Sequence, residues 1–209
     1  MLQYKVEIRA RYGGAVRRTH RKEKSMDLIT GIKERRSIRK FADKKVPHEV
    51  MEEIVNVAAY APSWKNTQIS RYIVVEDREK IAALATEETC LGFPYNCKTM
   101  SKAPAIVIQT VVNGRSGYEK DGSFTTPKGD RWEMYDAGIA AQTFCLAAHE
   151  KGVGTVIMGI FDENKVAEIV DIPEGQQVAA LIAVGYPAEG IEVAVPPRKD
   201  ASVLLSFVE

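Results

Sequence analysis

The sequence lacks any run of about 18 consecutive apolar residues, so no part of it predicts a membrane-spanning helix. Its basic N-terminus is not followed by the apolar stretch of a secretory signal peptide. Cysteine is scarce, with three residues in the chain. An odd cysteine count without a secretory signal favours free thiols in a reducing compartment. We therefore expect a cytoplasmic protein that does not associate with a membrane.

Motifs for metal binding and for nucleophilic catalysis are also missing. The three histidines, His20, His48 and His149, are too scattered to match metal-ligand spacing, and His149 is expected to be structural. The chain contains no P-loop and no G-x-S-x-G nucleophile elbow. We expect no metal site and no catalytic side chain, so any difficult chemistry would belong to a bound cofactor.

Charge divides the chain into two parts. Residues 1–25 are strongly basic, whereas the remainder is mildly acidic, which argues against a nucleic-acid surface on residues 26–209. The alternation of apolar and charged residues from Tyr4 to Tyr12, followed by Gly13-Gly14, is compatible with a β-hairpin. We divide the chain into a basic extension (1–25) and one domain (26–209). A solvated extension is favoured over one that contacts nucleic acid or anionic lipid.

The domain alternates long helical patterns with short apolar strands, which favours an α/β or α+β layered fold. Strands are predicted at 72–75, 105–112, 153–160 and 178–184. Helices are predicted from a Ser25 or Asp27 cap into the arginine cluster, from Pro47 to the residue before Pro62, from the Asp77 cap to Leu84, and at 134–151 and 163–170. Residues 87–102 are expected to be irregular, and the segment after Tyr186-Pro187 to be extended. Residues 113–131 predict a long loop of the kind that often serves as a lid or binding element.

The first candidate site is the cation cluster in ERRSIRKF, with Arg35, Arg36, Arg39 and Lys40 in close succession. In an extended segment Arg35, Ser37 and Arg39 would project to one side. Guanidinium groups together with a hydroxyl suit a phosphate dianion. The alternative is a helix C-terminus that carries cations because the helix dipole favours them.

The second candidate is APSWKNTQ, called here the amide motif (residues 61–68). Asn66 and Gln68 each offer a donor and an acceptor. Such amides suit the edge of a ring with alternating C=O and N–H groups, as in the pyrimidine part of a flavin. The alternative is an ordinary polar turn.

Two later segments add to these candidates. The glycines of GVGTVIMGIFD follow a helix and open a strand, so they do not form a dinucleotide-binding loop. Simple capping and turn roles account for Gly152 and Gly154, whereas Gly159 would let the backbone approach a flat ligand. Arg198 and Lys199 follow two prolines in a stiff segment and would either add charge at the same anion or form a solvated surface pair.

Together and in this order, these motifs resemble the FMN-dependent nitroreductase family, over residues 26 to about 200. The resemblance implies an α+β domain with a central, mostly antiparallel sheet flanked by helices, a homodimer, and tightly bound FMN. The implied FMN contacts are Arg35, Arg36, Ser37 and Arg39 for the phosphate and ribityl chain, Asn66 and Gln68 for the ring, Met158, Gly159 and Ile160 for its N5 edge, and Arg198 and Lys199 for a second phosphate contact. Trp64 and Ile69 stand where many members have Ser and Pro, which puts the shape of the pocket in question.

The resemblance also implies an activity. Family members pass a hydride in ping-pong fashion from NADH or NADPH, through FMN, to a small-molecule acceptor such as a nitroaromatic or a quinone. Two alternatives stay open: another flavin reaction on the same scaffold, namely flavin fragmentation or reductive dehalogenation, or a flavin-binding protein without enzymatic activity. The apolar end of the chain, Val203–Val208, would be costly to leave in water, so we expect it to dock on a partner subunit.

Overall fold

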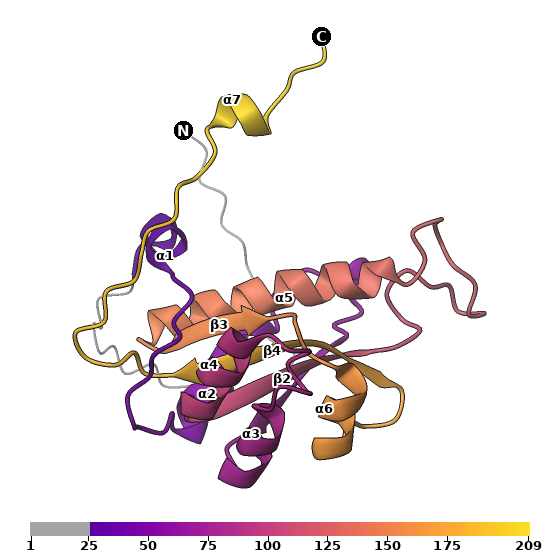
Figure 1. The fold of residues 1–209 in the computed structure, drawn as a ribbon. Helices are drawn as coiled ribbons and strands as arrows, with labels where there is room; N and C mark the ends of the chain where they lie inside the picture. The colour runs from indigo at the N-terminus through magenta and orange to yellow at the C-terminus, as the bar shows by residue number, and fades with distance from the viewer. Residues whose placement is uncertain (1–25) are drawn as a thin grey trace, which may run out of the picture.

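The computed structural model describes residues 26–209; the basic extension and its predicted hairpin lie outside the described residues. Residues 26–209 form a four-stranded antiparallel sheet in the order β1-β2-β4-β3, flanked by helices (Figure 1). The strands are β1 (Ser70–Val75), β2 (Ala105–Val112), β3 (Gly154–Met158) and β4 (Gln176–Gly185). The expected α+β architecture with an antiparallel sheet is confirmed.

Helices cover both faces of the sheet. The helices are α1 (Leu28–Glu34), α2 (His48–Ala58), α3 (Arg78–Leu84), α4 (Pro94–Lys102), α5 (Arg131–Glu150), α6 (Glu163–Ile169) and α7 (Ala201–Leu204), with a short 3-10 turn, η1 (Trp64–Asn66). Side chains alternate across each strand, so Val107 of β2 packs with α2 and α5, whereas Ile106 and Ile108 pack with α3, α4 and α6. The result is three layers. None of the helices within residues 26–209 is long and apolar enough to cross a membrane.

Several helix starts follow directly from the sequence. The carboxylates of Asp27, Asp77 and Asp162 accept hydrogen bonds from backbone N–H groups in the first turns of α1, α3 and α6. Such caps satisfy donors that have no partner inside the helix. The predicted starts of α1 and α6 and the end of α3 at Leu84 are therefore confirmed.

Several expectations about secondary structure were wrong. Helix α2 ends at Ala58, three residues before the predicted end, and β3 ends at Met158 instead of residue 160. Residues 94–102 form α4 rather than irregular chain: Pro94 occupies its first turn, where the missing N–H costs nothing, and Met100 is fully buried. Helix α5 begins at Arg131, three residues before the predicted start. The C-terminal segment contains α7, which Asp200 caps, although the residues on either side of it are extended as expected.

Candidate functional site

The arginine cluster lies on an extended segment that continues the sheet beyond β3. Helix α1 ends at Glu34, and Ser37 forms an isolated parallel bridge with Thr155 of β3. The Ile38 N–H donates to the carbonyl oxygen of Thr155 at 2.9 Å. A Cβ built on Gly154 would lie 2.8 Å from the Ile38 side chain. Gly154 therefore permits this close approach, a tertiary role that differs from the simple turn role expected from the sequence.

A cavity of about 250 Å³ opens beside this segment, and its lining includes Arg35, Arg36, His149 and Thr155. Within residues 26–209, Arg36 Nε and His149 Nε2 are buried without a hydrogen-bond partner. Burial lowers the pKa of His149, and the charge of Arg35 lowers it further. Unpaired buried polar atoms beside two guanidinium groups suit a ligand that brings acceptor oxygens. Sequence reasoning treated His149 as structural, and only the fold places it here.

The amide motif has a strained backbone. The φ angles of Lys65, Asn66 and Gln68 are 45°, 56° and 49°, a left-handed conformation that non-glycine residues seldom adopt. The motif is held in place from within and from α5: Gln68 N–H donates to Ser63 Oγ at 2.9 Å, and Trp64 N–H donates to Asp136 Oδ2 at 2.9 Å. Asn66 and Gln68 themselves are exposed. Strain held by the surrounding structure is typical of functional sites.

The loop between β2 and α5 braces the amide motif. The ring centroids of Trp64 and Trp132 lie 4.9 Å apart, and Trp132 Nε1 donates to Thr126 Oγ1 at 2.9 Å. Lys65 Nζ lies 2.9 Å from Glu119 Oε1. The expectation that residues 113–131 form a long excursion is confirmed, and the excursion makes direct contacts with the motif.

The excursion is anchored at its base by Glu133 on α5, which is almost completely buried. Glu133 Oε1 accepts from the Gly114 N–H at 2.7 Å, and Oε2 accepts from Gln177 Nε2 at 2.9 Å. Burial raises the pKa of Glu133, and these hydrogen bonds counteract part of that shift. The carboxylate thus ties the loop to the end of the sheet.

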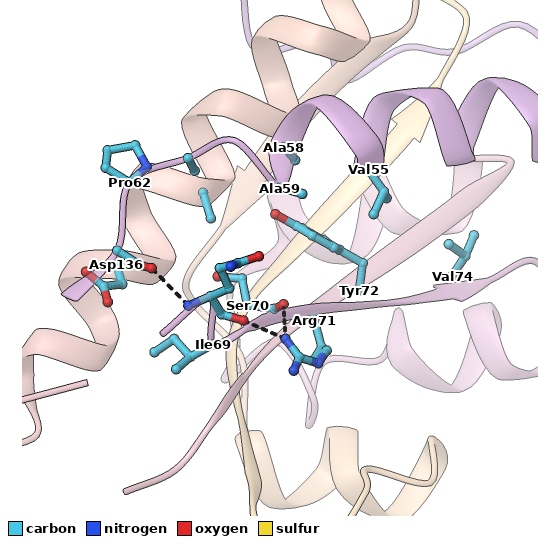
Figure 2. Close-up of a pocket in the computed structure, with 14 residues that line it drawn as sticks. Val55, Ala58, Ala59, Pro62, Ile69, Ser70, Arg71, Tyr72, Val74 and Asp136 are labelled. Carbon is cyan, nitrogen blue, oxygen red and sulfur yellow. Dashed lines mark hydrogen bonds between the residues drawn. The ribbon is translucent and has the colours of Figure 1, made fainter. Parts of the chain in front are cut away.

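A pocket of about 340 Å³ lies next to the amide motif, between α2, β1 and α5 (Figure 2). Its lining includes Val55, Ser63, Gln68, Tyr72 and Asp136. The Tyr72 hydroxyl is buried without a partner among residues 26–209, and burial raises the pKa of Tyr72 to about 12. The pocket therefore combines apolar walls with a neutral phenol.

The turn after β3 contains the third group of predicted contacts. Met158 is buried, whereas Gly159 is exposed, and no atom of residues 26–209 lies within 4 Å of a Cβ built on it. The carbonyl oxygen of Ile160 accepts from Asn96 Nδ2 at 3.0 Å. Sequence reasoning missed Asn96 because it lies in the segment expected to be irregular. A signal was present, since an amide three residues into a helix that begins with proline is well placed to reach a neighbouring turn.

The fold brings some predicted residues together and separates others. The cavity at Arg35 and the turn at Gly159 lie at the two ends of β3, at one edge of the sheet. The amide motif precedes β1, at the opposite edge, roughly 14 Å away at three strand spacings. The motif contacts α5 at Asp136, and the arginine cavity contacts α5 at His149, about 20 Å further along the helix.

The remaining two predicted FMN contacts lie on the C-terminal segment, which leads away from the body of the domain. Arg198 and Lys199 are exposed, and Arg198 Nη1 donates to the carbonyl oxygen of Pro196 at 3.0 Å. Figure 1 shows this segment passing α1 and carrying α7 away from the sheet. Val193 lines the arginine cavity, so the segment leaves the domain at that point.

This arrangement defines an α+β protein with a cavity lined by two arginines and an open backbone turn along one sheet edge. The sequence pattern of the nitroreductase family matches residues 32–186, and the chain belongs to that family. It is 33% identical over 172 residues to a Methanothermobacter thermautotrophicus protein named as a candidate NADH dehydrogenase/NAD(P)H nitroreductase, covering 80% of this chain and 81% of that one.

Two further comparisons bear on the chemistry. An iodotyrosine deiodinase from Haliscomenobacter hydrossis is 27% identical over 200 residues, covering 87% of this chain and 89% of that one. A crystal structure of a candidate nitroreductase from Desulfovibrio desulfuricans in complex with FMN matches with a TM-score of 0.65 at 25% identity, covering 87% of this chain and 96% of that one.

Proposed function

We propose that the protein is an FMN-dependent oxidoreductase that passes a hydride, in ping-pong fashion, from NADH or NADPH to a nitroaromatic, quinone or similar acceptor. The observation that carries this proposal is the β3 edge, where a cavity with two arginines lies at one end and an open glycine turn at the other. An extended ligand with a terminal phosphate and a flat ring fits that pattern. The name of the Methanothermobacter relative and the FMN in the Desulfovibrio structure support it.

The residues present fit FMN. Arg35 and the unpaired Nε of Arg36 would hold the phosphate, with Ser37 and Arg39 following along the same extended segment. Gly159 leaves room for a ring to lie against the backbone. When bound there, FMN would supply the two-electron chemistry of the reaction.

The chain's own part in the reaction is positioning. Asn96 fixes the Ile160 carbonyl, and Asp162 N–H donates to the carbonyl oxygen of Thr89 at 2.8 Å, so the later half of the turn after β3 is tied to neighbouring elements at two points. Buried Met158 closes the inner side of the turn to water. No acid or base from the chain is required, because orientation alone lowers the barrier to a transfer between two bound planar groups.

We propose further that the active protein is a homodimer in which each FMN site is completed by the partner's amide motif. Within one subunit the arginine cavity and the amide motif lie at opposite sheet edges, which favours contacts to one cofactor from two different subunits. The exposed apolar side chains of the C-terminal segment would be buried by the partner; they include Val203, Leu204, Leu205, Phe207 and Val208. Arg198 and Lys199 lie on the same segment and would reach the phosphate only after it has docked.

Subunit complementation tests this arrangement. Arg35→Ala damages the arginine cavity, and Asn66→Ala damages the amide motif. If the site crosses the interface, a heterodimer of the two variants has one intact site and one doubly damaged site, so it should bind one FMN with the affinity of the unaltered protein. If each site lies within one subunit, both sites of the heterodimer carry a defect and neither regains full affinity.

The measurement is FMN titration of the purified heterodimer, isolated with two different affinity tags, beside both homodimeric variants. Light scattering of the unaltered protein checks the dimer itself. NAD(P)H oxidation with and without added menadione or nitrofurazone then separates an enzyme from a flavin-binding protein. Absence of acceptor-dependent turnover in the FMN-loaded dimer would contradict the enzymatic proposal.

A second candidate reaction is reductive dehalogenation, favoured by the similarity to the Haliscomenobacter iodotyrosine deiodinase. The braced excursion at residues 113–131 would then select the acceptor. The two reactions are distinguished by supplying dithionite-reduced, FMN-loaded protein with either 3-iodotyrosine or a nitroaromatic. Iodide release at a rate comparable with nitro reduction would favour the deiodinase chemistry, and its absence would exclude it.

A further inference from the structure

Two thiols meet behind the turn that follows β3. Cys90 is completely buried, and Cys97, which lies partly exposed in the first half of α4, packs against the same core cluster. Both belong to the core between the sheet and helices α3, α4 and α6. Cys145, the third cysteine, lies on α5 in the core on the other face of the sheet. The chain therefore contains one thiol pair and one separate thiol.

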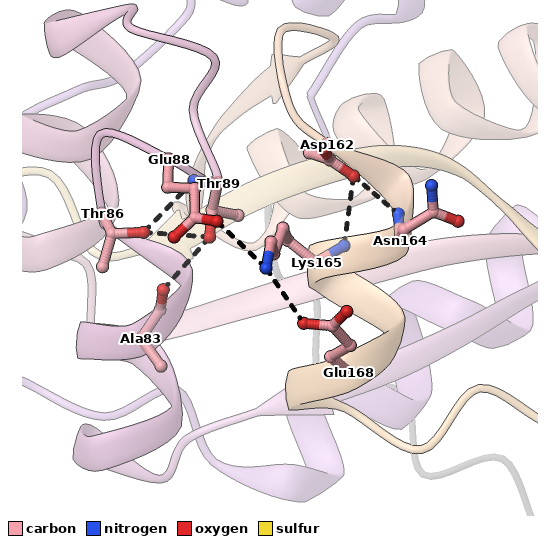
Figure 3. Close-up of polar contacts among 8 residues, drawn as sticks. All are labelled: Ala83, Thr86, Glu88, Thr89, Asp162, Asn164, Lys165 and Glu168. Atoms are coloured by element: carbon pink, nitrogen blue, oxygen red, sulfur yellow. Dashed lines mark hydrogen bonds and ion pairs between the residues drawn. The ribbon is translucent and has the colours of Figure 1, made fainter.

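The segment that carries Cys90 is held by a polar network. The carbonyl oxygen of Thr86 accepts from the Cys90 N–H at 3.0 Å and from Cys97 Sγ at 3.2 Å, so one acceptor contacts both residues. Lys165 of α6 bridges Glu88 at 3.0 Å and Glu168 at 3.3 Å (Figure 3). This network fixes the backbone around Cys90, and the shared Thr86 carbonyl holds Cys97 close to it.

The same segment contacts the turn after β3 at two points. Asn96, the neighbour of Cys97, donates through Nδ2 to the carbonyl oxygen of Ile160, and the carbonyl oxygen of Thr89, the neighbour of Cys90, accepts from the Asp162 N–H. Each cysteine is thus one residue from a hydrogen bond that positions residues 160–162. A covalent bond between the sulfurs would pull Cys97 away from the Thr86 carbonyl and shift the helical turn that includes Asn96.

We propose that Cys90 and Cys97 form a reversible intrachain disulfide on reaction with a hydroperoxide, and that the disulfide loosens the turn at residues 158–160. The effect on cofactor binding rests on the proposed function, whereas the disulfide itself does not. Reaction begins at Cys97, which is the more accessible sulfur.

The proposed disulfide forms in two steps. The deprotonated Cys97 sulfur attacks one peroxide oxygen, the O–O bond breaks, and water or an alcohol leaves, so that Cys97 becomes a sulfenic acid. The Cys90 sulfur then attacks the Cys97 sulfur, the S–O bond breaks, and a water molecule leaves with the Cys90 proton. Two electrons pass from the thiols to the peroxide, and a dithiol reductant restores both thiols. Burial raises the pKa of the Cys90 thiol to about 12, which suits the resolving rather than the attacking role.

Thiol counting tests the disulfide without reference to the cofactor. The full-length protein is treated with hydrogen peroxide, denatured, alkylated with a maleimide and weighed by mass spectrometry. The reduced protein should take up three maleimide groups and the oxidised protein one, with a crosslink between the peptides that contain Cys90 and Cys97. Cys145→Ser, the matched control, should take up two maleimide groups when reduced and none after oxidation. Cys97→Ser should take up two maleimide groups both before and after mild oxidation. Retention of all three groups by the oxidised protein, or a disulfide that includes Cys145, would overturn the proposal.

The effect on the turn is measured by FMN titration of the disulfide and dithiol forms. Loss of one hydrogen bond of about average strength predicts about fivefold weaker binding by the disulfide form, reversed by dithiothreitol and absent in Cys97→Ser. Equal affinities in a protein shown to contain the disulfide would overturn the link to the turn. If neither form binds FMN, the thiol count still decides the disulfide, and the proposed function fails separately.

Discussion

The two edges of the sheet hold the two main predicted motifs in different ways. At the β3 edge, the arginine segment has an ordinary extended backbone, hydrogen-bonded to Thr155, and lines a cavity with two unpaired buried polar atoms. At the β1 edge, the amide motif has three left-handed residues and needs Asp136, Trp132 and Glu119 to hold it. The first edge presents its cations on a relaxed backbone. The second has a strained backbone that other elements stabilise.

This difference predicts separate contributions of the two edges to the proposed FMN site. The guanidinium groups at the cavity would supply binding energy for an anion, because charged hydrogen bonds are stronger than neutral ones. A strained, braced turn supplies geometry, because the surrounding contacts restrict it to one conformation. Substitutions at the β3 edge should therefore weaken FMN binding. Substitutions at the β1 edge should first lower the local stability of the fold.

The largest effect is expected when the C-terminal segment is removed. A chain ending at Ala194 loses the exposed apolar side chains of residues 195–209, each of which would gain about 1.5–3 kcal/mol on burial against a partner. We expect this shorter chain to be a monomer without FMN. Light scattering and the absorption spectrum of the purified protein measure both properties. A truncated protein that stays a dimer with bound flavin would show that the segment is needed neither for dimerisation nor for FMN binding.

Arg35→Ala tests the affinity role of the β3 edge. Loss of a charged hydrogen bond costs about 1.5–3 kcal/mol, which corresponds to about 10- to 150-fold weaker FMN binding. Lys40→Ala is the control, because Lys40 is exposed and is not among the residues that line the cavity. Titration of both apoproteins with FMN gives the comparison. Equal losses of FMN affinity in the two variants would indicate diffuse charge attraction instead of specific contacts in the cavity.

Trp132→Ala tests the brace at the β1 edge. The variant loses ring packing against Trp64 and the hydrogen bond to Thr126, so we expect unfolding free energy to fall by at least the value of an aromatic pair, about 0.5–1.5 kcal/mol. Tyr135→Ala, which removes an exposed ring one helical turn away, should cost less. Urea denaturation measures both. Faster proteolysis within residues 113–131 should accompany the larger loss.

The ion pair between Lys65 and Glu119 is expected to contribute less to stability than the Trp132 ring, because both side chains are partly exposed to solvent. A double-mutant cycle with Lys65→Met and Glu119→Gln isolates the pairwise energy. This energy should decrease at 1 M salt, where exposed charges are screened. A coupling that is unchanged by salt would mean that the contact is held by packing.

The smallest effect is expected from His149, and it should appear in the pH dependence of stability. Since burial and Arg35 lower the pKa of His149 in the folded state, the unfolded chain binds the proton more readily, and stability should be lost as the pH falls below about 6.5. Thermal midpoints at pH 7.5 and pH 5.5 should differ more in the unaltered protein than in His149→Gln. The same difference in both proteins would contradict this role.

Much of the secondary structure could be predicted because its signals are local. Aspartate caps, a proline before α2 and the apolar run of β2 each act within a few residues of chain. Helix α4 escaped prediction because its sequence is polar and weakly periodic, and it is held by burial of Met100 and Asn96 against other elements. The short helix α7 was missed for a similar reason, since it spans only one turn.

The sequence by itself determined which chemical groups are available: the arginines, the amides and a glycine beside a strand end. It could do so because residue type and spacing set charge, hydrogen-bonding capacity and backbone freedom. Only the tertiary structure decided which of these groups are neighbours. The antiparallel order β1-β2-β4-β3 places the arginine segment and the amide motif at opposite edges, and packing of α5 brings His149 to the arginines. Pairings between segments far apart in sequence depend on how the whole core packs, which no local pattern records.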